Sequence, residues 1–367
     1  MKKAILILFF TISYNFILAQ QYQFTPVIDI PVSSVKNQGK TGTCWSFSTT
    51  SFIESEIERI SGKKIDISEM YTVRTTYDEK AWNYVMRQGN AQFSEGGLAH
   101  DLMNAIRLNG LLPQEAFTGL YGQAKGYDHS KIEPEIKEIL NKYIQKDSII
   151  TDWEYPTKTI LDQHIGAHVT TFSYEGKTYT PMAFLTMTKL NPDAYITLTS
   201  FTHKPYYTKF ILNIPDNFSN GSFYNLPLND YMDIIDTALK NGYTVELDID
   251  ASEPTFSQKA GVAIIPKQIE NNQKGLSQIV DEKLITPDFR QAEFENFNTT
   301  DDHLMHITGI VKDQKGNKYY KVKNSWGPNV TNGGFIYISE SFMQLKSISI
   351  MVHTDVIPKK IKKILEL

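Results

Sequence analysis

The clearest hydrophobic periodicity in the chain follows residue 44. Ile53, Ile57 and Ile60 recur at the i, i+4 and i+7 spacing of one helical face, and Ser61-Gly62 ends the pattern. Similar patterns predict a second helix from about residue 68 to 87 and a third from 98 to 109. The first third of the chain is therefore expected to be mostly helical.

The last third has the pattern of β-strands. Short runs rich in β-branched and aromatic residues, separated by turn residues, predict strands at 243–249, 261–266, 306–311, 319–323 and 334–338. Helices followed by a strand-rich portion favour an α+β fold with two lobes. A cleft between two such lobes is where a functional site is expected.

Composition limits the possible partners. The 367 residues are 41% hydrophobic and 21% charged, which is enough apolar material for one large domain or two smaller ones. A net charge of −4 gives no electrostatic footprint for nucleic acid, so we expect no nucleic-acid partner.

The N-terminus has the features of a secretory signal peptide. Met1-Lys2-Lys3 is positively charged, residues 4–18 are mostly apolar, and Ala19 precedes Gln20 at a plausible cleavage point. Polar residues within the run disfavour a membrane anchor, and no other stretch is long and apolar enough to span a bilayer. We expect residues 1–19 to be removed and the mature chain to be exported to a periplasm or the exterior.

Cys44 is the only cysteine, so the chain cannot form an internal disulfide. A solitary cysteine is often an inert core residue, but here Gly42-Thr43-Cys44 stands directly before the first predicted helix. Unpaired N–H groups and the positive dipole end of a helix favour thiolate over thiol. This position predicts a reactive nucleophile.

A thiolate nucleophile requires a base that a third group holds in place. His303 stands at the entry of a predicted strand, and His306 is its competitor. Three residues apart on a strand, the two rings would point to opposite faces, so we expect no shared metal and no cofactor. Asn324 can accept the imidazole N–H, and Trp326 can shield that bond from water.

Taken together, these residues resemble the papain-like cysteine peptidases. The resemblance implies that Cys44 is the nucleophile, His303 the general base and acid, and Asn324 the residue that orients the imidazole. Gln38 would stabilise the oxyanion together with the backbone N–H of Cys44, and Trp326 would cover the His303–Asn324 bond. The implied reaction hydrolyses a peptide bond of a peptide or protein substrate through a thioester.

The resemblance also suggests residues that bind substrate. Gly96-Gly97 is similar to the glycine pair that borders the substrate cleft in this family. We therefore expect Gly96, Gly97, Trp45 and Trp326 to contact the substrate.

Two departures from the pattern point to one branch of the family. Thr41 stands where the usual signature has a cysteine, and His303 lies 259 positions after Cys44 instead of about 130–150. An insertion at 122–230, between a helical lobe at 20–121 and a β-rich lobe with a tail at 231–367, would account for the long interval. Members of the bleomycin hydrolase or aminopeptidase C branch, which this chain resembles, lack the disulfides and carry such an insertion.

That branch implies aminopeptidase-like activity and a homo-oligomer, although the oligomeric state stays open. Its members use their C-terminal segment to meet the substrate's free amine, and an extended tail from about Pro358 would be long enough to reach a cleft. Two alternatives remain: an endopeptidase with an open cleft, and a papain-like protein that binds without turnover.

Overall fold

The structure is a computed structural model that describes residues 22–120, 124–145, 149 and 151–367. The expected signal peptide at residues 1–19 lies outside the described residues. The α-helices are α1 (Cys44–Ser61), α2 (Glu69–Met86), α3 (Ala99–Asn109), α4 (Ile132–Tyr143), α5 (Glu154–His164), α6 (Pro181–Thr188), α7 (Leu228–Lys240), α8 (Asn272–Gly275), α9 (Pro287–Glu295), α10 (Glu340–Lys346) and α11 (Lys359–Leu365). The strands are β1 (Thr25–Asp29), β2 (Phe172–Tyr174), β3 (Lys177–Tyr179), β4 (Tyr195–Thr199), β5 (Lys209–Ile211), β6 (Ser222–Asn225), β7 (Val245–Ile249), β8 (Phe256–Ser257), β9 (Val262–Ala263), β10 (His303–Lys312), β11 (Lys318–Lys323), β12 (Phe335–Ser339) and β13 (Ser347–His353).

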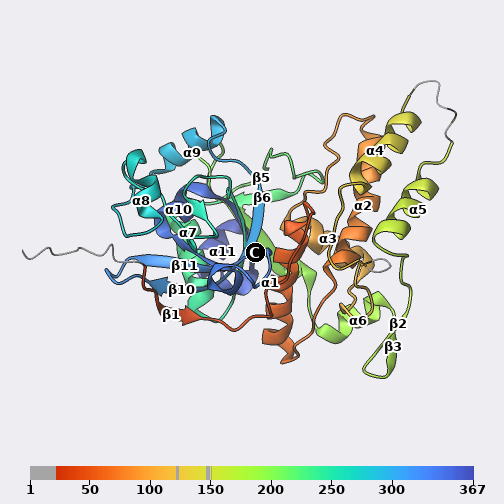
Figure 1. Cartoon of the computed structure of the whole chain (residues 1–367), viewed down its shortest axis with the longest axis horizontal. Coiled ribbons are helices and arrows are strands. Elements are labelled where there is room, and N and C mark those ends of the chain that lie inside the picture. Colours follow the sequence, from red (N-terminus) through yellow and green to blue (C-terminus); the bar gives the residue numbers. More distant parts are fainter. Residues whose placement is uncertain (1–21, 121–123, 146–148, 150) are drawn as a thin grey trace, which may run out of the picture.

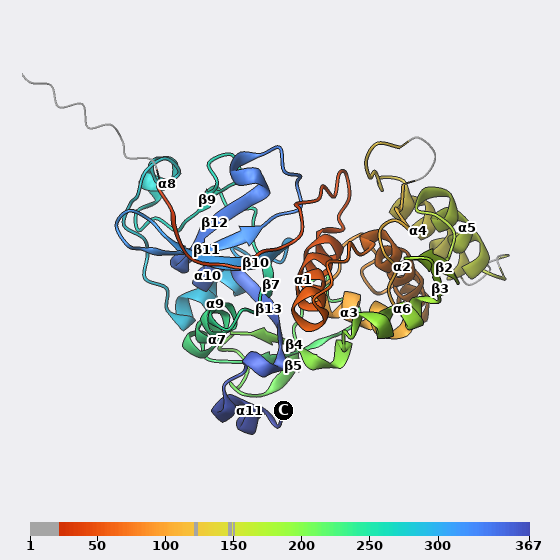
Figure 2. The same ribbon diagram turned by 90° about the horizontal axis from the view of Figure 1, so that it is seen from below.

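One large mixed sheet and a group of helices divide the molecule into two sides (Figure 1). The sheet has eleven strands among the described residues, in the order β5-β6-β4-β13-β7-β10-β11-β12-β9-β8 with β1 added on β10. All of its pairs are antiparallel except β4–β6 and β12–β9. Helices α2 to α6 lie on the other side, and α1 lies between them and the sheet (Figure 2). The α+β fold expected from the sequence is confirmed.

Strand β10 is the longest strand and carries the centre of the sheet. Its first half pairs with β7 from His303 to Ile307, and its second half pairs with β1. On its other edge it pairs with β11 from His306 onward. Because of this register, His303 lies at the very start of the strand, where it is held by β7 alone.

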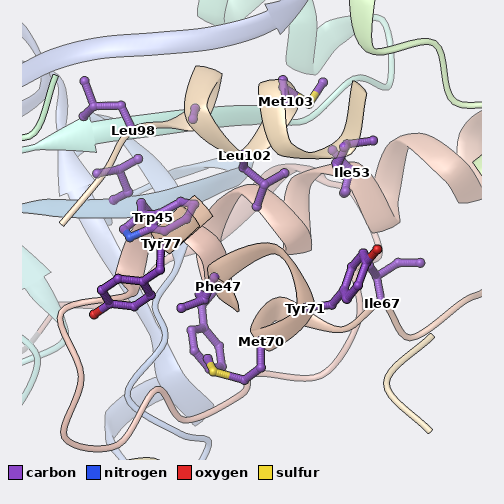
Figure 3. Packing of buried hydrophobic residues seen from close by; sticks show 14 of the residues in the cluster. Trp45, Phe47, Ile53, Ile67, Met70, Tyr71, Tyr77, Leu98, Leu102 and Met103 are labelled. Atoms are coloured by element: carbon purple, nitrogen blue, oxygen red, sulfur yellow. The ribbon is translucent and has the colours of Figure 1, made fainter. Parts of the chain in front are cut away.

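The first predicted helices form because their ends are capped and their apolar faces are buried. Ser68 caps α2 by accepting a hydrogen bond from the Tyr71 backbone N–H at 3.1 Å. Gly62 ends α1 in the left-handed conformation with φ of 72°, which glycine adopts without strain. Ile53 and Ile57 of α1 are fully buried, and Figure 3 shows Ile53 in the helical-side core together with side chains from α2 and α3.

Residues 122–230 contribute to both sides instead of forming a body of their own. Helices α4, α5 and α6 and the β2–β3 hairpin pack into the helical-side core. Strands β4, β5 and β6 extend the large sheet through the pairing of β4 with β13. The segment at 212–221, which joins β5 to β6, therefore starts and ends on the sheet.

The C-terminal tail does not lie in the cleft, contrary to the expectation from the branch. Residues Lys359–Leu365 form helix α11, and its side chains Ile361 and Leu365 are buried in the sheet-side core. Figure 2 shows α11 beside the chain's end, away from the start of α1. The reason is amphipathicity: most lysines of α11 face water, while the apolar Ile361 and Leu365 side chains leave water by packing against the sheet.

Candidate active site

Cys44 is the first residue of α1. The three residues that follow it, Trp45, Ser46 and Phe47, are buried, whereas Cys44 itself is half-buried and lines an open cleft. Gly42 lies two residues before Cys44, and the Gly42 backbone N–H donates to the Glu95 Oε2 at 2.6 Å. A side chain at Gly42 would press against that of Glu95, so this position needs a glycine.

His303 and Asn324 meet at the ends of two neighbouring strands. His303 begins β10, Asn324 follows β11, and the His303 Nε2 and the Asn324 Oδ1 are 2.8 Å apart. With Nε2 held there, Nδ1 is the ring nitrogen left to exchange a proton with a nucleophile. The Trp326 ring stacks on the imidazole with centroids 4.9 Å apart and an angle of 24° between the planes.

Gln258 fixes the orientation of the Asn324 amide. Its Oε1 accepts a hydrogen bond from the Asn324 Nδ2 at 2.9 Å, while the Ser325 backbone N–H donates to the Asn324 Oδ1 at 2.7 Å. Gln258 is itself held because its Nε2 donates to two backbone carbonyls, those of Thr331 and Phe335. Sequence reasoning missed this residue, since Gln258 lies in a turn with no motif around it.

Gln38 lies in the same cleft as Cys44. Its side-chain Oε1 accepts from the Ser325 hydroxyl, and its Nε2 donates to the Thr41 carbonyl at 2.7 Å. The amide nitrogen carries a second hydrogen that this bond does not use. That hydrogen and the backbone N–H of Cys44 are two donors on the same side of the cleft.

The cleft encloses about 680 Å³ and brings together residues from distant parts of the sequence. Cys44, Gln38, His303, Trp326 and Gly96 all lie along it. Its other lining residues are Thr41, Gly42, Gln92, Ser94, Glu95, Glu133, Asp216, Ala251, Ser252 and Asp302. Three of the four predicted catalytic residues and two of the four predicted substrate-binding residues thus share one surface, and the fourth catalytic residue, Asn324, is bonded to His303 behind it.

Two of the residues expected to bind substrate, Trp45 and Gly97, do not line the cleft. Trp45 is 1% exposed, and Figure 3 shows it among the buried side chains of the core with Leu98 and Tyr77. Its indole N–H donates to the Glu95 carbonyl at 3.0 Å, and its ring packs behind Gly97. The expectation of a substrate contact for Trp45 is wrong, because the large apolar ring is buried and supports the cleft wall from the inside.

Burial controls the protonation of the two reacting groups. It raises the pKa of the Cys44 thiol to about 12, against a lowering hydrogen bond from the Leu304 backbone, and the Asp216 and Asp301 carboxylates raise it further. Burial also lowers the pKa of the His303 imidazole to about 4. Burial therefore acts against the thiolate form that the N-terminal end of a helix favours, and against the charged form of the imidazole.

Comparison with known proteins identifies the family. The model of the Peptidase C1-like family matches residues 124–367, and that of the papain family of cysteine proteases matches residues 25–160. The chain belongs to the Peptidase C1-like family. It is a papain-like cysteine peptidase of the bleomycin hydrolase and aminopeptidase C branch.

Two relatives and one solved structure match the chain along nearly its whole length. Aminopeptidase C of Listeria monocytogenes is 22% identical over 91% of this chain and 83% of its own length. Aminopeptidase G of Lactobacillus delbrueckii is 21% identical over 96% of this chain and 88% of its own length. The crystal structure of PepW from Lactobacillus rhamnosis has a TM-score of 0.72 at 18% identity and covers 93% of this chain and 84% of its own, so the two share a fold.

The described residues offer no place for a metal. No group of three or more His, Cys, Asp or Glu side chains among them has the geometry to hold one.

His306, the competitor of His303, is buried on the opposite side of β10, where its Nδ1 lies 2.9 Å from the Ser51 hydroxyl. No helix in the described ranges is long and apolar enough to cross a membrane.

Proposed function

We propose that this papain-like peptidase is a cysteine aminopeptidase that removes residues from the N-terminus of peptides through a Cys44–His303–Asn324 site. The observation that carries the proposal is the shared cleft of Cys44 and His303, with the imidazole held from behind by Asn324 and covered by Trp326. Aminopeptidase activity is supported by two relatives, which carry the names aminopeptidase C and aminopeptidase G.

The chemistry follows from the positions of these groups. The Cys44 Sγ gives its proton to the His303 Nδ1 and attacks the carbonyl carbon of the scissile bond. The developing oxyanion is stabilised by the Cys44 backbone N–H and the Gln38 side-chain amide. His303 then protonates the leaving amine, and a thioester to Cys44 remains.

Hydrolysis of the thioester completes the cycle. His303 takes a proton from water, which attacks the thioester carbonyl and releases the acid product and the Cys44 thiol. Asn324 accepts from the Nε2–H of His303 throughout, so the ring neither rotates nor changes tautomer between the two halves of the reaction.

The test is thiol-dependent turnover of short fluorogenic substrates. The wild type is expected to cleave leucyl-aminomethylcoumarin and to be labelled at one site by a thiol-directed epoxide. Cys44→Ala should lose labelling and at least about 10³-fold of the kcat/KM, whereas Ser55→Ala on the same helix should retain both. Turnover that survives Cys44→Ala would refute the mechanism, and cleavage of only N-terminally blocked peptides would indicate the open-cleft endopeptidase instead.

We also propose that the protein is exported. The support is the sequence of residues 1–19, with its basic start, apolar run and Ala19 before Gln20. N-terminal sequencing of the protein from fractionated cells is expected to begin at Gln20 outside the cytoplasm. A cytoplasmic protein that keeps Met1 would contradict export.

A further inference from the structure

The segment at 212–221 crosses from the sheet to the helical side next to the cleft. Between β5 and β6 it contacts helix α2, where the Asn83 Nδ2 donates to the Phe218 carbonyl at 3.2 Å. It contacts helix α3 as well, where the His100 Nε2 and the Ser219 hydroxyl are 3.0 Å apart. Asn217 braces the segment internally by bonding the carbonyls of residues 212 and 221 and the N–H of residue 221. The segment is thus fixed on both sides of the molecule.

Asp216 is the residue of this segment that enters the cleft. Its carboxylate lies directly over Gly96, because a Cβ added to that glycine would collide with both carboxylate oxygens. The Gln92 Nε2 donates to the Asp216 Oδ1 at 3.0 Å and holds the carboxylate there. A peptide chain that passes over Gly96 toward Cys44 would lie beside this carboxylate.

The other acids along the cleft are occupied differently. The Glu95 Oε2 accepts from the Gly42 N–H at 2.6 Å, and the Asp302 Oδ1 accepts from the Ala251 N–H at 2.8 Å, so both carboxylates complete the backbone of the site. The hydrogen bond from Gln92 engages only one oxygen of Asp216. Its Oδ2 remains for a ligand that donates hydrogen bonds.

Two further carboxyl groups lie behind Asp216. The backbone N–H of Asp216 donates to the Asp301 Oδ2 at 3.4 Å. Asp248 is 1% exposed, and burial and the neighbouring Asp301 raise its pKa well above the ordinary range, so it is the protonated member of this group. Asp216 is the member that lines the cleft.

One lysine lies close enough to act on these charges. The Lys80 ammonium lowers the pKa of Asp216, although burial raises that pKa by more. Its hydrogen bonds, however, go to the backbone carbonyls of Ser94 and Gly96. Lys80 therefore fixes the backbone at Ser94 and Gly96 and is not hydrogen-bonded to the Asp216 carboxylate.

We propose that the carboxylate of Asp216 binds the free α-ammonium group of the substrate and so confines cleavage to the N-terminus. The inference rests on the proposed cysteine aminopeptidase function and names the specificity-determining residue of that site. It assigns to the segment at 212–221 a role that helix α11, buried against the sheet, does not take. The attraction of an ammonium for a buried carboxylate exceeds that of any neutral donor in the same place.

The experiment compares free and acetylated substrates. Leucyl-aminomethylcoumarin and glycyl-leucyl-aminomethylcoumarin are each assayed with a free and with an N-acetylated amine. We expect the wild type to prefer the free amine by at least about 100-fold in kcat/KM. Asp216→Asn should lower kcat/KM for the preferred free-amine substrate by at least about 30-fold, mainly through KM, and leave the acetylated substrate within about threefold. The preferred length of the free-amine substrate tells whether one or two residues separate Asp216 from the scissile bond.

Matched controls distinguish the loss of the Asp216 carboxylate from the loss of any other negative charge in the cleft. Glu133→Gln removes a carboxylate elsewhere along the same cleft and should change the ratio of free to acetylated turnover by less than about threefold. Complete epoxide labelling of Cys44, together with a wild-type circular dichroism spectrum and melting temperature, shows that Asp216→Asn is folded; its labelling rate is not compared, because Asp216 acts on the pKa of Cys44. If that variant does not fold, Gln92→Leu, which removes the exposed anchor of Asp216, is expected to shift the ratio in the same direction by about fivefold.

The outcomes distinguish the two proposals. An unchanged ratio in folded Asp216→Asn, or in Gln92→Leu if the first variant does not fold, overturns the role of Asp216 while thiol-dependent cleavage still supports the peptidase mechanism. A wild type that cleaves neither substrate, or a Cys44→Ala variant as active as the wild type, instead overturns the proposed function.

Discussion

The hydrogen bond between Gln258 and Asn324 determines which end of the Asn324 amide faces His303. In the observed orientation the Asn324 Nδ2 donates to Gln258 and the Oδ1 accepts from His303. In the reversed orientation two oxygens would face each other at Gln258, and two donors would face each other at His303. Replacing Gln258 by leucine removes the acceptor that disfavours reversal without touching the three residues of the site.

The expected loss of kcat in Gln258→Leu follows from the hydrogen bonds that Asn324 keeps in the variant. A neutral hydrogen bond contributes about 0.5–1.5 kcal/mol, and about 1.4 kcal/mol corresponds to a tenfold change in rate. The Ser325 N–H still donates to the Asn324 Oδ1 at 2.7 Å in the variant, so the correct orientation is weakened but kept in part. We therefore expect Gln258→Leu to lower kcat by about three- to tenfold, with KM unchanged because Gln258 does not line the cleft.

Steady-state kinetics on leucyl-aminomethylcoumarin measure this loss, and two variants bracket it. Gln258→Glu keeps an acceptor for Asn324 but loses the two bonds to the Thr331 and Phe335 carbonyls, so it should retain more of kcat than Gln258→Leu, while its negative charge shifts the acid limb of the pH profile to higher pH. Gln268→Leu, at an exposed glutamine, should have no effect. Wild-type kcat in Gln258→Leu would refute the orienting role, and so would an equal rise in KM.

The remaining predictions concern pH and stability. With acetylated substrates kcat should stay level down to about pH 4, because the pKa of His303 is lowered to about 4 by burial and the imidazole accepts a proton only above that pH. With free amines KM should also rise as pH falls through about 7, since burial and the charge of Asp216 raise the pKa of Asp301 to about 7 and its protonation weakens the cation site; a flat KM profile would contradict this. Ser68→Ala should cost about 1 kcal/mol in urea unfolding through the lost cap of α2, and a change under about 0.3 kcal/mol would argue against it. Deletion of residues 359–367 should lower the free energy of unfolding by about 3 kcal/mol, because two buried aliphatic side chains are lost, yet keep the preference for free amines. Loss of that preference would indicate that the C-terminal tail binds the substrate's amine in the cleft.

The sequence predicts those parts of the site that depend on local signals. Cys44 before a helix, His303 at a strand entry and Asn324 before a turn are each marked by their neighbours, and the family motif joins them. Ends of α1 and α2 were predictable for the same reason, because Gly62 and Ser68 are terminal residues by their own conformational and hydrogen-bonding properties.

The parts of the site that the sequence did not predict depend on which strands pair and on which side chains are buried. Asp216 lies in a Pro-Asp-Asn turn typical of any surface loop, and only the parallel pairing of β6 with β4 carries it to Gly96. The degree of burial of Trp45 and of the Cys44 thiol was not predictable from the sequence either. Trp45 is buried in the core and does not line the cleft. Burial raises the pKa of the Cys44 thiol, whereas its position at a helix end predicted a lowered pKa.

The anchored segment at 212–221 has a consequence for the products of the reaction. Its two ends are strands of the sheet that also carries His303, and its tip is bonded to helices of the side that carries Cys44. The Asp216 carboxylate held on this frame and the Cys44 sulfur at the start of α1 are therefore kept at a fixed separation. If Asp216 binds the substrate's ammonium group as we propose, that separation sets the number of residues released at each turnover, and one peptide would be shortened repeatedly by equal steps.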